Sequence, residues 1–268
     1  MQHGKSKKPV KPVQKPYLTG APYDSNVPKS ALGVFFGILI MAVAHLFLGA
    51  LMLVDLQVLK VTANVLVFVF AMLLFYYAGT SNGTIAVNQG EIMYRRKETD
   101  REVSADDLSR CYHPLKGFVI GLIGCSLAFL MAAFLALTTR RLMTTPGVLP
   151  SWVTSVGRAE VSEPLAFYTA VEPMTATGFV RVLVRMILMP FVNLIGAENS
   201  DSLLILERLS PLLVLLPGVA YGLGYQRGTV VRTRVHTDIA EGRRKAAKKA
   251  KRQKKARQRQ AAGPQQLN

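Results

Sequence analysis

Residues 31–54 read ALGVFFGILIMAVAHLFLGALMLV, twenty-four consecutive positions without Asp, Glu, Lys or Arg. As a helix rising 1.5 Å per residue, the stretch is about 36 Å long, enough to cross a bilayer core of roughly 30 Å. A secretory signal peptide has a shorter apolar core and a small-residue cleavage site, whereas this stretch leads directly to Asp55 and another apolar run. We therefore expect residues 31–54 to form a retained transmembrane helix.

Four further apolar stretches follow, and one of them differs from the rest. Residues 179–196 carry Arg181 and Arg185 four positions apart on one helical face, with Pro190 in the interior. Arginines at this depth and an internal proline make insertion across the membrane costly. We therefore predict an all-α membrane protein with an interfacial or re-entrant amphipathic helix at 179–196 and four transmembrane helices, at 31–54, 61–79, 117–138 and 203–225.

The distribution of charge indicates the orientation. The 268-residue chain has a formal net charge of +17, and all but three of its basic residues lie outside the apolar stretches. With four spans, the N-terminus, the loop 80–116 and the C-terminal tail share one side and hold 26 of the 33 Lys and Arg residues. A five-span alternative, with 179–196 crossing, moves the basic residues of the first two segments to the outer face. Because basic residues accumulate on the cytoplasmic side, we expect both termini in the cytoplasm of a bacterial cell.

The chain then divides into three parts. Residues 1–30 are predicted to be a disordered basic arm, 31–225 a transmembrane bundle, and 226–268 a basic cytoplasmic tail. Within the bundle, we expect the cytoplasmic loop 80–116 to contain a β-hairpin, with strands at 84–87 and 91–94 and a turn at Gly90, followed by a short helix capped by Ser104. Within the outer segment 139–202, residues 139–178 are expected to form a partly helical cap that leads into the amphipathic helix, with Trp152 and Tyr168 at the membrane interface.

Small side chains recur along two of the apolar stretches. In 117–138 they are spaced three or four positions apart, which places them on one helical face, and 203–225 contains a glycine pair four apart. Small faces let helix backbones approach closely within lipid. The predicted helix-packing residues are Gly117, Gly121, Ala128, Gly218 and Gly222.

A few polar residues within apolar stretches are candidates for function. His45 lies near the middle of the first stretch, where a proton relay or substrate contact is one interpretation and a hydrogen bond to a neighbouring helix is the preferred one. Arg181, Arg185 and Asn193 share a polar stripe. We interpret the stripe as a headgroup contact, with a groove for a polar or anionic substrate as the alternative.

The sequence contains no common catalytic motif. It lacks the H-E-x-x-H, G-x-S-x-G and Walker patterns and has no paired intramembrane aspartates. Two cysteines, Cys111 and Cys125, are too few for a disulfide framework or a thiolate metal site. We therefore expect a protein that is not an enzyme and has no cofactor or metal.

The tail contains eleven Lys and Arg residues within 243–260, and alanine is the only apolar residue in that stretch. A helix with charges all round has no face to insert into acyl chains, so we expect electrostatic binding. Anionic headgroups of the lipid bilayer are the preferred polyanion, because the tail is tethered beside them, and ribosomal RNA is the alternative. No groove-reading fold accompanies the charge, so sequence-specific DNA recognition is not expected. The predicted polyanion-binding residues are Arg243, Arg244, Lys245, Lys248, Lys249, Lys251, Arg252, Lys254 and Lys255.

Two functional classes follow from these features. The first is a noncatalytic accessory or scaffold subunit that contacts other membrane subunits. The second is a small transporter or an insertase that holds ribosomes by its tail. In its basic C-terminus the chain resembles Oxa1-type insertases, and that resemblance implies Arg181 or Arg185 as a groove arginine. The N-terminal orientation, the short first loop at 55–60 and the number of spans depart from the insertase pattern.

Overall fold

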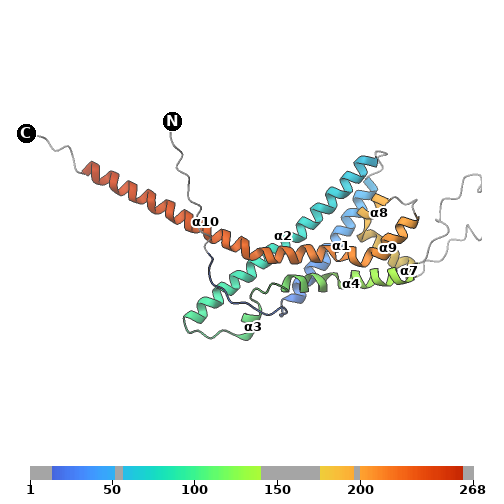
Figure 1. The fold of residues 1–268 in the computed structure, drawn as a ribbon, viewed down its shortest axis with the longest axis horizontal. Helices are drawn as coiled ribbons and strands as arrows, with labels where there is room; N and C mark the ends of the chain where they lie inside the picture. Colours follow the sequence, from blue (N-terminus) through green and yellow to red (C-terminus); the bar gives the residue numbers. More distant parts are fainter. Residues whose placement is uncertain (1–13, 52–56, 140–175, 196–199, 262–268) are drawn as a thin grey trace, which may run out of the picture. The chain divides into compact units, whose positions relative to one another are not determined.

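The structure is a computed structural model that describes residues 14–51, 57–139, 176–195 and 200–261. All regular secondary structure in these ranges is helical (Figure 1). The expected outer segment lies outside the described residues over 140–175, including Trp152 and Tyr168. The helices are α1 (Val27–Leu51), α2 (Gln57–Glu98), α3 (Ala105–Ser109), α4 (Lys116–Thr138), α7 (Ala176–Ile187), α8 (Met189–Ile195), α9 (Ser200–Val214) and α10 (Leu216–Ala261).

Four helical segments are long and apolar enough to cross a membrane, which confirms the predicted fold class. They lie within Val27–His45, Val61–Glu98, Lys116–Thr138 and Asp201–Lys255. The last segment is interrupted between α9 and α10 at Leu215, two residues before Pro217. Proline lacks the N–H that an internal helical position would donate, so a change of helix at this point has a local cause.

The amphipathic stretch forms a broken helix pair, as expected for a re-entrant segment. Helices α7 and α8 are bent by 90° relative to each other. The break lies at Leu188, whose N–H still donates to the Val184 carbonyl at 3.0 Å. Two residues later, Pro190 has no N–H for the carbonyl of Met186, so α7 cannot continue past this point.

The predicted β-hairpin in loop 80–116 is wrong, because α2 continues as a helix through both expected strands to Glu98. Gly90 lies inside this helix, and a Cβ there would lie 2.6 Å from the carbonyl oxygen of Leu18. The glycine therefore permits a close backbone approach instead of a turn. The short helix α3 was predicted correctly and follows Ser104, although the Ser104 side chain makes no capping hydrogen bond.

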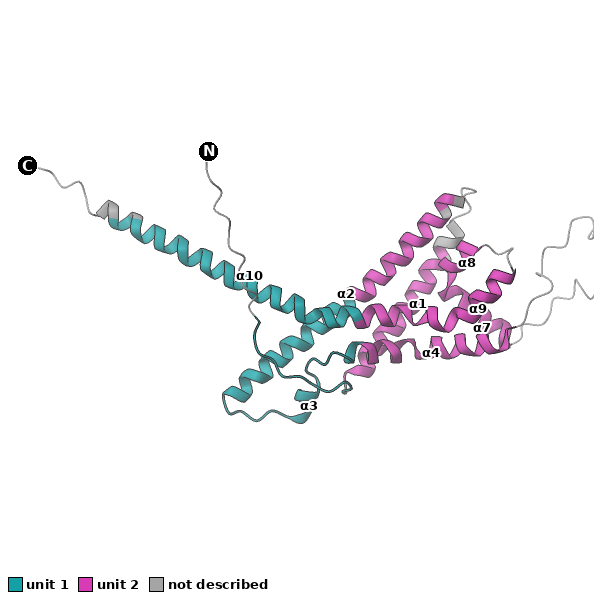
Figure 2. Cartoon of the chain, viewed as in Figure 1, with its two compact units in different colours: residues 1–25, 78–117, 223–268 teal, residues 26–77, 118–222 magenta. Residues whose placement is uncertain are grey.

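The chain divides into two compact units (Figure 2). Unit 1 comprises residues 1–25, 78–117 and 223–268, which include the ends of α2 and α10 that follow their apolar parts. Unit 2 comprises 26–77 and 118–222 and holds most of the apolar helical residues. Within unit 2, α1 packs against α7 and α8, and α8 packs against α9.

Glycines bring helix backbones into contact in both units. In unit 2, Gly121 of α4 faces Gly218 of α10, and a Cβ on Gly218 would lie 2.9 Å from the Gly121 carbonyl oxygen. Gly222 lies against the ring of Phe118, and Ala128 is buried. In unit 1, Gly117 of α4 contacts Tyr225 of α10. The side chain of a larger residue has no room at these glycines without a shift of the neighbouring helix.

Candidate functional sites

The first candidate site is in unit 2 and consists of Arg181, Arg185, Glu207 and Thr139, which we call the arginine–glutamate cluster. The two arginines lie one turn apart on α7, Glu207 is on α9, and Thr139 directly follows the last residue of α4. Arg185 donates from Nε and Nη2 to Glu207 Oε1 at 2.9 and 2.6 Å. The Nε of Arg181 lies 3.0 Å from the same oxygen. Three helices are therefore joined through one carboxylate.

Thr139 closes the network on its other side. Its hydroxyl donates to Glu207 Oε2, and it accepts a hydrogen bond from Arg181 Nη2 at 3.0 Å. The Glu207 side chain is 4% exposed, compared with 17% for Arg181 and 32% for Arg185. A carboxylate buried to this degree requires charged partners. Two guanidinium groups share one carboxylate, so the cluster carries a formal charge of +1.

Asn193 lies apart from the two arginines with which it was predicted to share a stripe. It is on α8, beyond the 90° break, and its Nδ2 donates to Asn64 Oδ1 on α2 at 3.1 Å. The ring of Phe191 packs edge-on against Phe68 with centroids 5.1 Å apart. Asn193 therefore belongs to the contact between α8 and α2, because the break at Leu188 redirects the helix.

His45 is buried in α1. Neither ring nitrogen has a hydrogen-bond partner among the described residues, so the hydrogen bond expected from a neighbouring helix is not found there. No group of three His, Cys, Asp or Glu side chains suited to a metal occurs in the described part of the chain. The described residues thus show that His45 is buried but do not indicate a role for it in proton transfer or ligand binding.

The second site is in unit 1, and sequence analysis missed it. Glu91 of α2 is buried, and its carboxylate contacts Arg232 Nη2 at 2.9 Å and His236 Nε2 at 2.6 Å, both on α10. Asn88, one turn before Glu91, accepts a second hydrogen bond from Arg232 Nη2 at 2.6 Å. We call these four residues the Glu91 clamp. They join the ends of two long helices by one buried charge network.

The clamp determines the protonation of its carboxylate. Glu91 lies twelve residues beyond the predicted apolar stretch 61–79, in the polar end of α2. Burial by itself raises the pKa of the Glu91 carboxyl, but the hydrogen bonds and positive charges of Arg232 and His236 outweigh burial and hold the pKa below its ordinary value. Glu91 is therefore ionised at neutral pH and provides the negative charge that Arg232 requires.

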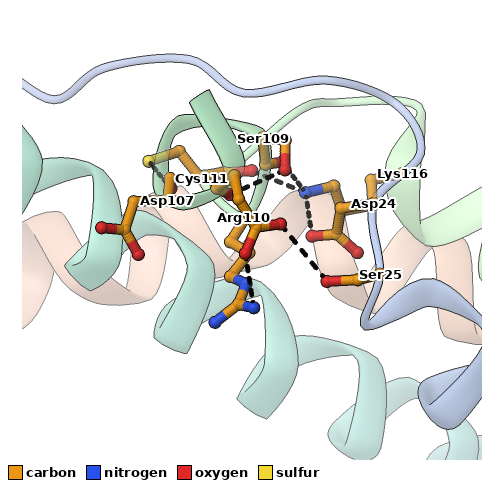
Figure 3. A network of polar contacts seen from close by, with 8 residues as sticks. Asp24, Ser25, Asp107, Ser109, Arg110, Cys111 and Lys116 are labelled. Atoms are coloured by element: carbon orange, nitrogen blue, oxygen red, sulfur yellow. Dashed lines mark hydrogen bonds and ion pairs between the residues drawn. The ribbon is translucent and has the colours of Figure 1, made fainter. Parts of the chain in front are cut away.

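A third network in unit 1 fixes the segment before α1 (Figure 3). Lys116 Nζ lies 3.1 Å from Asp24 Oδ2, and both side chains are buried. The same ammonium donates to the carbonyls of Ser109 and Cys111 at 2.7 and 2.8 Å. Nearby, Gly20 N donates to the Tyr112 carbonyl at 2.9 Å. Residues 14–25 thus have no regular secondary structure but are held by these contacts, and residues 1–13 of the predicted disordered arm lie outside the described residues.

The basic tail belongs to α10, which continues to Ala261. Every residue from Gly242 to Lys255 is exposed, including all nine basic residues predicted to bind a polyanion. Lys245 forms an ion pair with Glu241 at 3.7 Å, in the (i, i+4) arrangement that supports a helix. The positive charges are therefore accessible from all sides of the helix.

Known proteins provide no further guide to these sites. The chain matches no protein-family profile, and no match was found among curated proteins or solved structures. Function must therefore be inferred from the geometry of the sites themselves.

Proposed function

We propose that the protein is a noncatalytic accessory or scaffold subunit of a bacterial cytoplasmic membrane, with a basic helix that binds a polyanion on the cytoplasmic side. The observation that carries the proposal is the continuity of α10 from an apolar segment into the exposed basic residues. The basic part contains no apolar side chain larger than alanine over 243–260. Its binding energy must therefore come from charge.

The length of α10 favours a polyanion in the cytosol over the headgroups of the same membrane. Arg243 lies eighteen residues after Tyr225, the last residue of the predicted span, which corresponds to about 27 Å of helix. Arg259 lies about 51 Å along the same helix. Electrostatic attraction decays over a Debye length of about 8 Å at physiological salt. A helix that keeps its direction carries these charges beyond the reach of the headgroups, so we favour structured RNA.

The Glu91 clamp supports this arrangement. It joins the end of α2 to α10 between the apolar part and the basic part, through Arg232 and His236. Gly83 and Gly228 add a close backbone contact between the same two helices. A paired helix bends less readily than a single one, so the clamp helps α10 to hold its direction.

A transporter or insertase is supported less well. Either function needs a polar groove that a substrate can enter. The guanidinium groups of Arg181 and Arg185 are instead engaged by Glu207, and Arg181 also by Thr139. The two arginines of α7 are thus used mainly for internal ion pairs.

The proposal is tested by RNA binding to the full-length protein in nanodiscs. In one variant, all nine polyanion-binding residues are replaced by Gln, and in the matched control each Lys is exchanged for Arg and each Arg for Lys. We expect the control to bind an RNA duplex as the original chain does and the Gln variant to lose binding. If about four phosphates are neutralised, affinity falls roughly 10²-fold between 50 and 200 mM salt. RNA binding that survives in the Gln variant would contradict the proposal.

The lipid composition of the nanodisc separates the two polyanions. If α10 holds the basic residues away from the bilayer, RNA affinity is the same in zwitterionic and anionic nanodiscs. If headgroups hold the tail, anionic lipid competes with RNA, and the affinity is at least tenfold lower in anionic nanodiscs. The second result would assign the tail to the membrane surface.

A further inference from the structure

We propose that Arg185 binds the phosphate group of a membrane phospholipid, with Arg181, Glu207 and Thr139 holding its guanidinium in position. The inference uses only the residues of unit 2 and the membrane assignment of the helices, and it does not depend on the function proposed for the tail.

The first argument is the charge of the arginine–glutamate cluster. Glu207 balances one guanidinium, and the described residues of the cluster contain no second carboxylate. An unbalanced charge in a poorly hydrated environment is costly, and an anion next to it lowers that cost. The cluster therefore has an electrostatic requirement that an anionic ligand satisfies.

The second argument identifies the guanidinium that is available. Arg181 is mostly buried, its Nη2 donates to Thr139, and its Nε lies 3.0 Å from Glu207 Oε1 without the geometry of a hydrogen bond. Arg185 uses Nε and Nη2 on a single oxygen of Glu207, and no described residue makes a hydrogen bond with its Nη1. A guanidinium has five N–H donors in a planar fork that matches phosphate oxygens. Arg185 can therefore keep its ion pair and still donate to a phosphate.

The third argument identifies the source of the phosphate as lipid. Val182, one turn before Arg185 on α7, is 48% exposed, and Phe179 is exposed one turn earlier. In a membrane bundle, exposed apolar side chains face acyl chains, so Arg185 borders a lipid-facing surface. Thr139 directly follows α4, whose 23 residues extend about 34 Å and match the thickness of a bilayer. The cluster therefore lies at the end of a span, at the depth of phospholipid phosphates.

The test is native mass spectrometry of the full-length protein in detergent, with measured lipid affinity. Phosphatidic acid and phosphatidylglycerol provide phosphate, and diacylglycerol is the matched lipid without it. Inorganic phosphate is the probe for a free ion. We expect the two phospholipids to bind at least tenfold more tightly than diacylglycerol, with inorganic phosphate competing only weakly. Equal binding of diacylglycerol overturns the proposal, and full displacement by millimolar inorganic phosphate overturns the lipid assignment.

Variants locate the site. Arg185→Gln removes one charge, and Arg208→Gln is the control because Arg208 is an exposed arginine next to Glu207 in the chain. We expect Arg185→Gln to abolish the preference for phospholipid and Arg208→Gln to retain it. The same loss in both variants, or in neither, contradicts a site at Arg185. The comparison of lipids on the unmodified chain remains decisive if Arg185→Gln does not fold.

Discussion

Replacing Glu91 with Gln should loosen the contact between the ends of α2 and α10. The substitution keeps the size of the side chain but leaves Arg232 and the buried His236 without their carboxylate. Breaking a buried ion pair costs about 3–5 kcal/mol. The Arg232 side chain is 24% exposed and can partly rehydrate, and the Gln oxygen still accepts one hydrogen bond. We therefore expect a loss of about 2 kcal/mol in the local free energy of opening.

Hydrogen exchange measures this free energy directly. A loss of about 2 kcal/mol corresponds to roughly 30-fold faster exchange of the amides that exchange through local opening. The increase should be confined to the helical parts that the clamp joins, near 83–94 and 225–238. Glu98→Gln is the matched control, because Glu98 is exposed at the end of the same helix. A change of less than about threefold in Glu91→Gln, or an equal change in the control, would refute the role of the clamp.

The clamp also predicts a dependence on pH. The folded pKa of Glu91 lies below its ordinary value of 4.5, so the stabilisation is fully present above that value. It is lost as pH falls through the lower folded pKa. Protection of 83–94 in the unmodified chain should therefore stay constant from neutral pH to about 5 and decline below 4.5. In Glu91→Gln, the protection of 83–94 should not show this decline below pH 4.5. If protection depends on pH identically in both proteins, the carboxylate of Glu91 is not its cause.

Three further predictions concern packing, the Lys116 network and the thiols. Gly121→Ala should lower the melting temperature of the protein, because the new Cβ would overlap the backbone of Gly218. Gly33 has open space around it, so Gly33→Ala should leave the melting temperature unchanged or raise it. Equal melting temperatures of the two variants would contradict the close contact at Gly121. Lys116→Met should cost about 3 kcal/mol by leaving Asp24 buried without its cation, and adding Asp24→Asn should restore part of that loss in a double-mutant cycle. Cys111 is buried and its pKa is raised mainly by burial, so its thiol should resist maleimide until the protein is denatured, and rapid labelling of the folded chain would contradict this.

The number of spans was predictable because it depends on a property of continuous sequence. A run of apolar residues such as 31–54 has to be long enough to cross a bilayer, whatever its neighbours are. The amphipathic helix was predictable for the same reason, since the spacing of Arg181 and Arg185 and the position of Pro190 are local. The break at Leu188 is also a local consequence of proline, although its 90° angle depends on packing.

The hairpin prediction failed because the structural role of Gly90 depends on a segment far away in the chain. Glycine between two short apolar runs is typical of a turn, but here it admits the backbone of Leu18 to the surface of a helix. The buried residues Ala86, Val87 and Met93 recur at helical spacing, and Glu91 lies among them. This helical spacing of apolar residues was present in the sequence, and it could have indicated that α2 continues beyond the apolar stretch 61–79.

The polar networks could not be predicted, because each joins residues from helices far apart in the chain. Arg181 and Arg185 were identified as unusual, but no local pattern pairs them with Glu207. The Glu91 clamp is similar, since Arg232 lies 141 positions from Glu91. Pairing of this kind depends on which helices pack together, and a single sequence does not specify it.

The proposed orientation is tested most directly by cysteine accessibility in intact cells, because the tail can bind a cytoplasmic polyanion only if it lies inside. Single cysteines are introduced by Ser104→Cys, Ala250→Cys and Ser155→Cys, and the unmodified chain, whose two cysteines are buried, is the blank. A membrane-impermeant maleimide should label only Ser155→Cys in intact cells and should label the other two variants after permeabilisation. Labelling of Ala250→Cys or Ser104→Cys in intact cells contradicts a cytoplasmic basic helix.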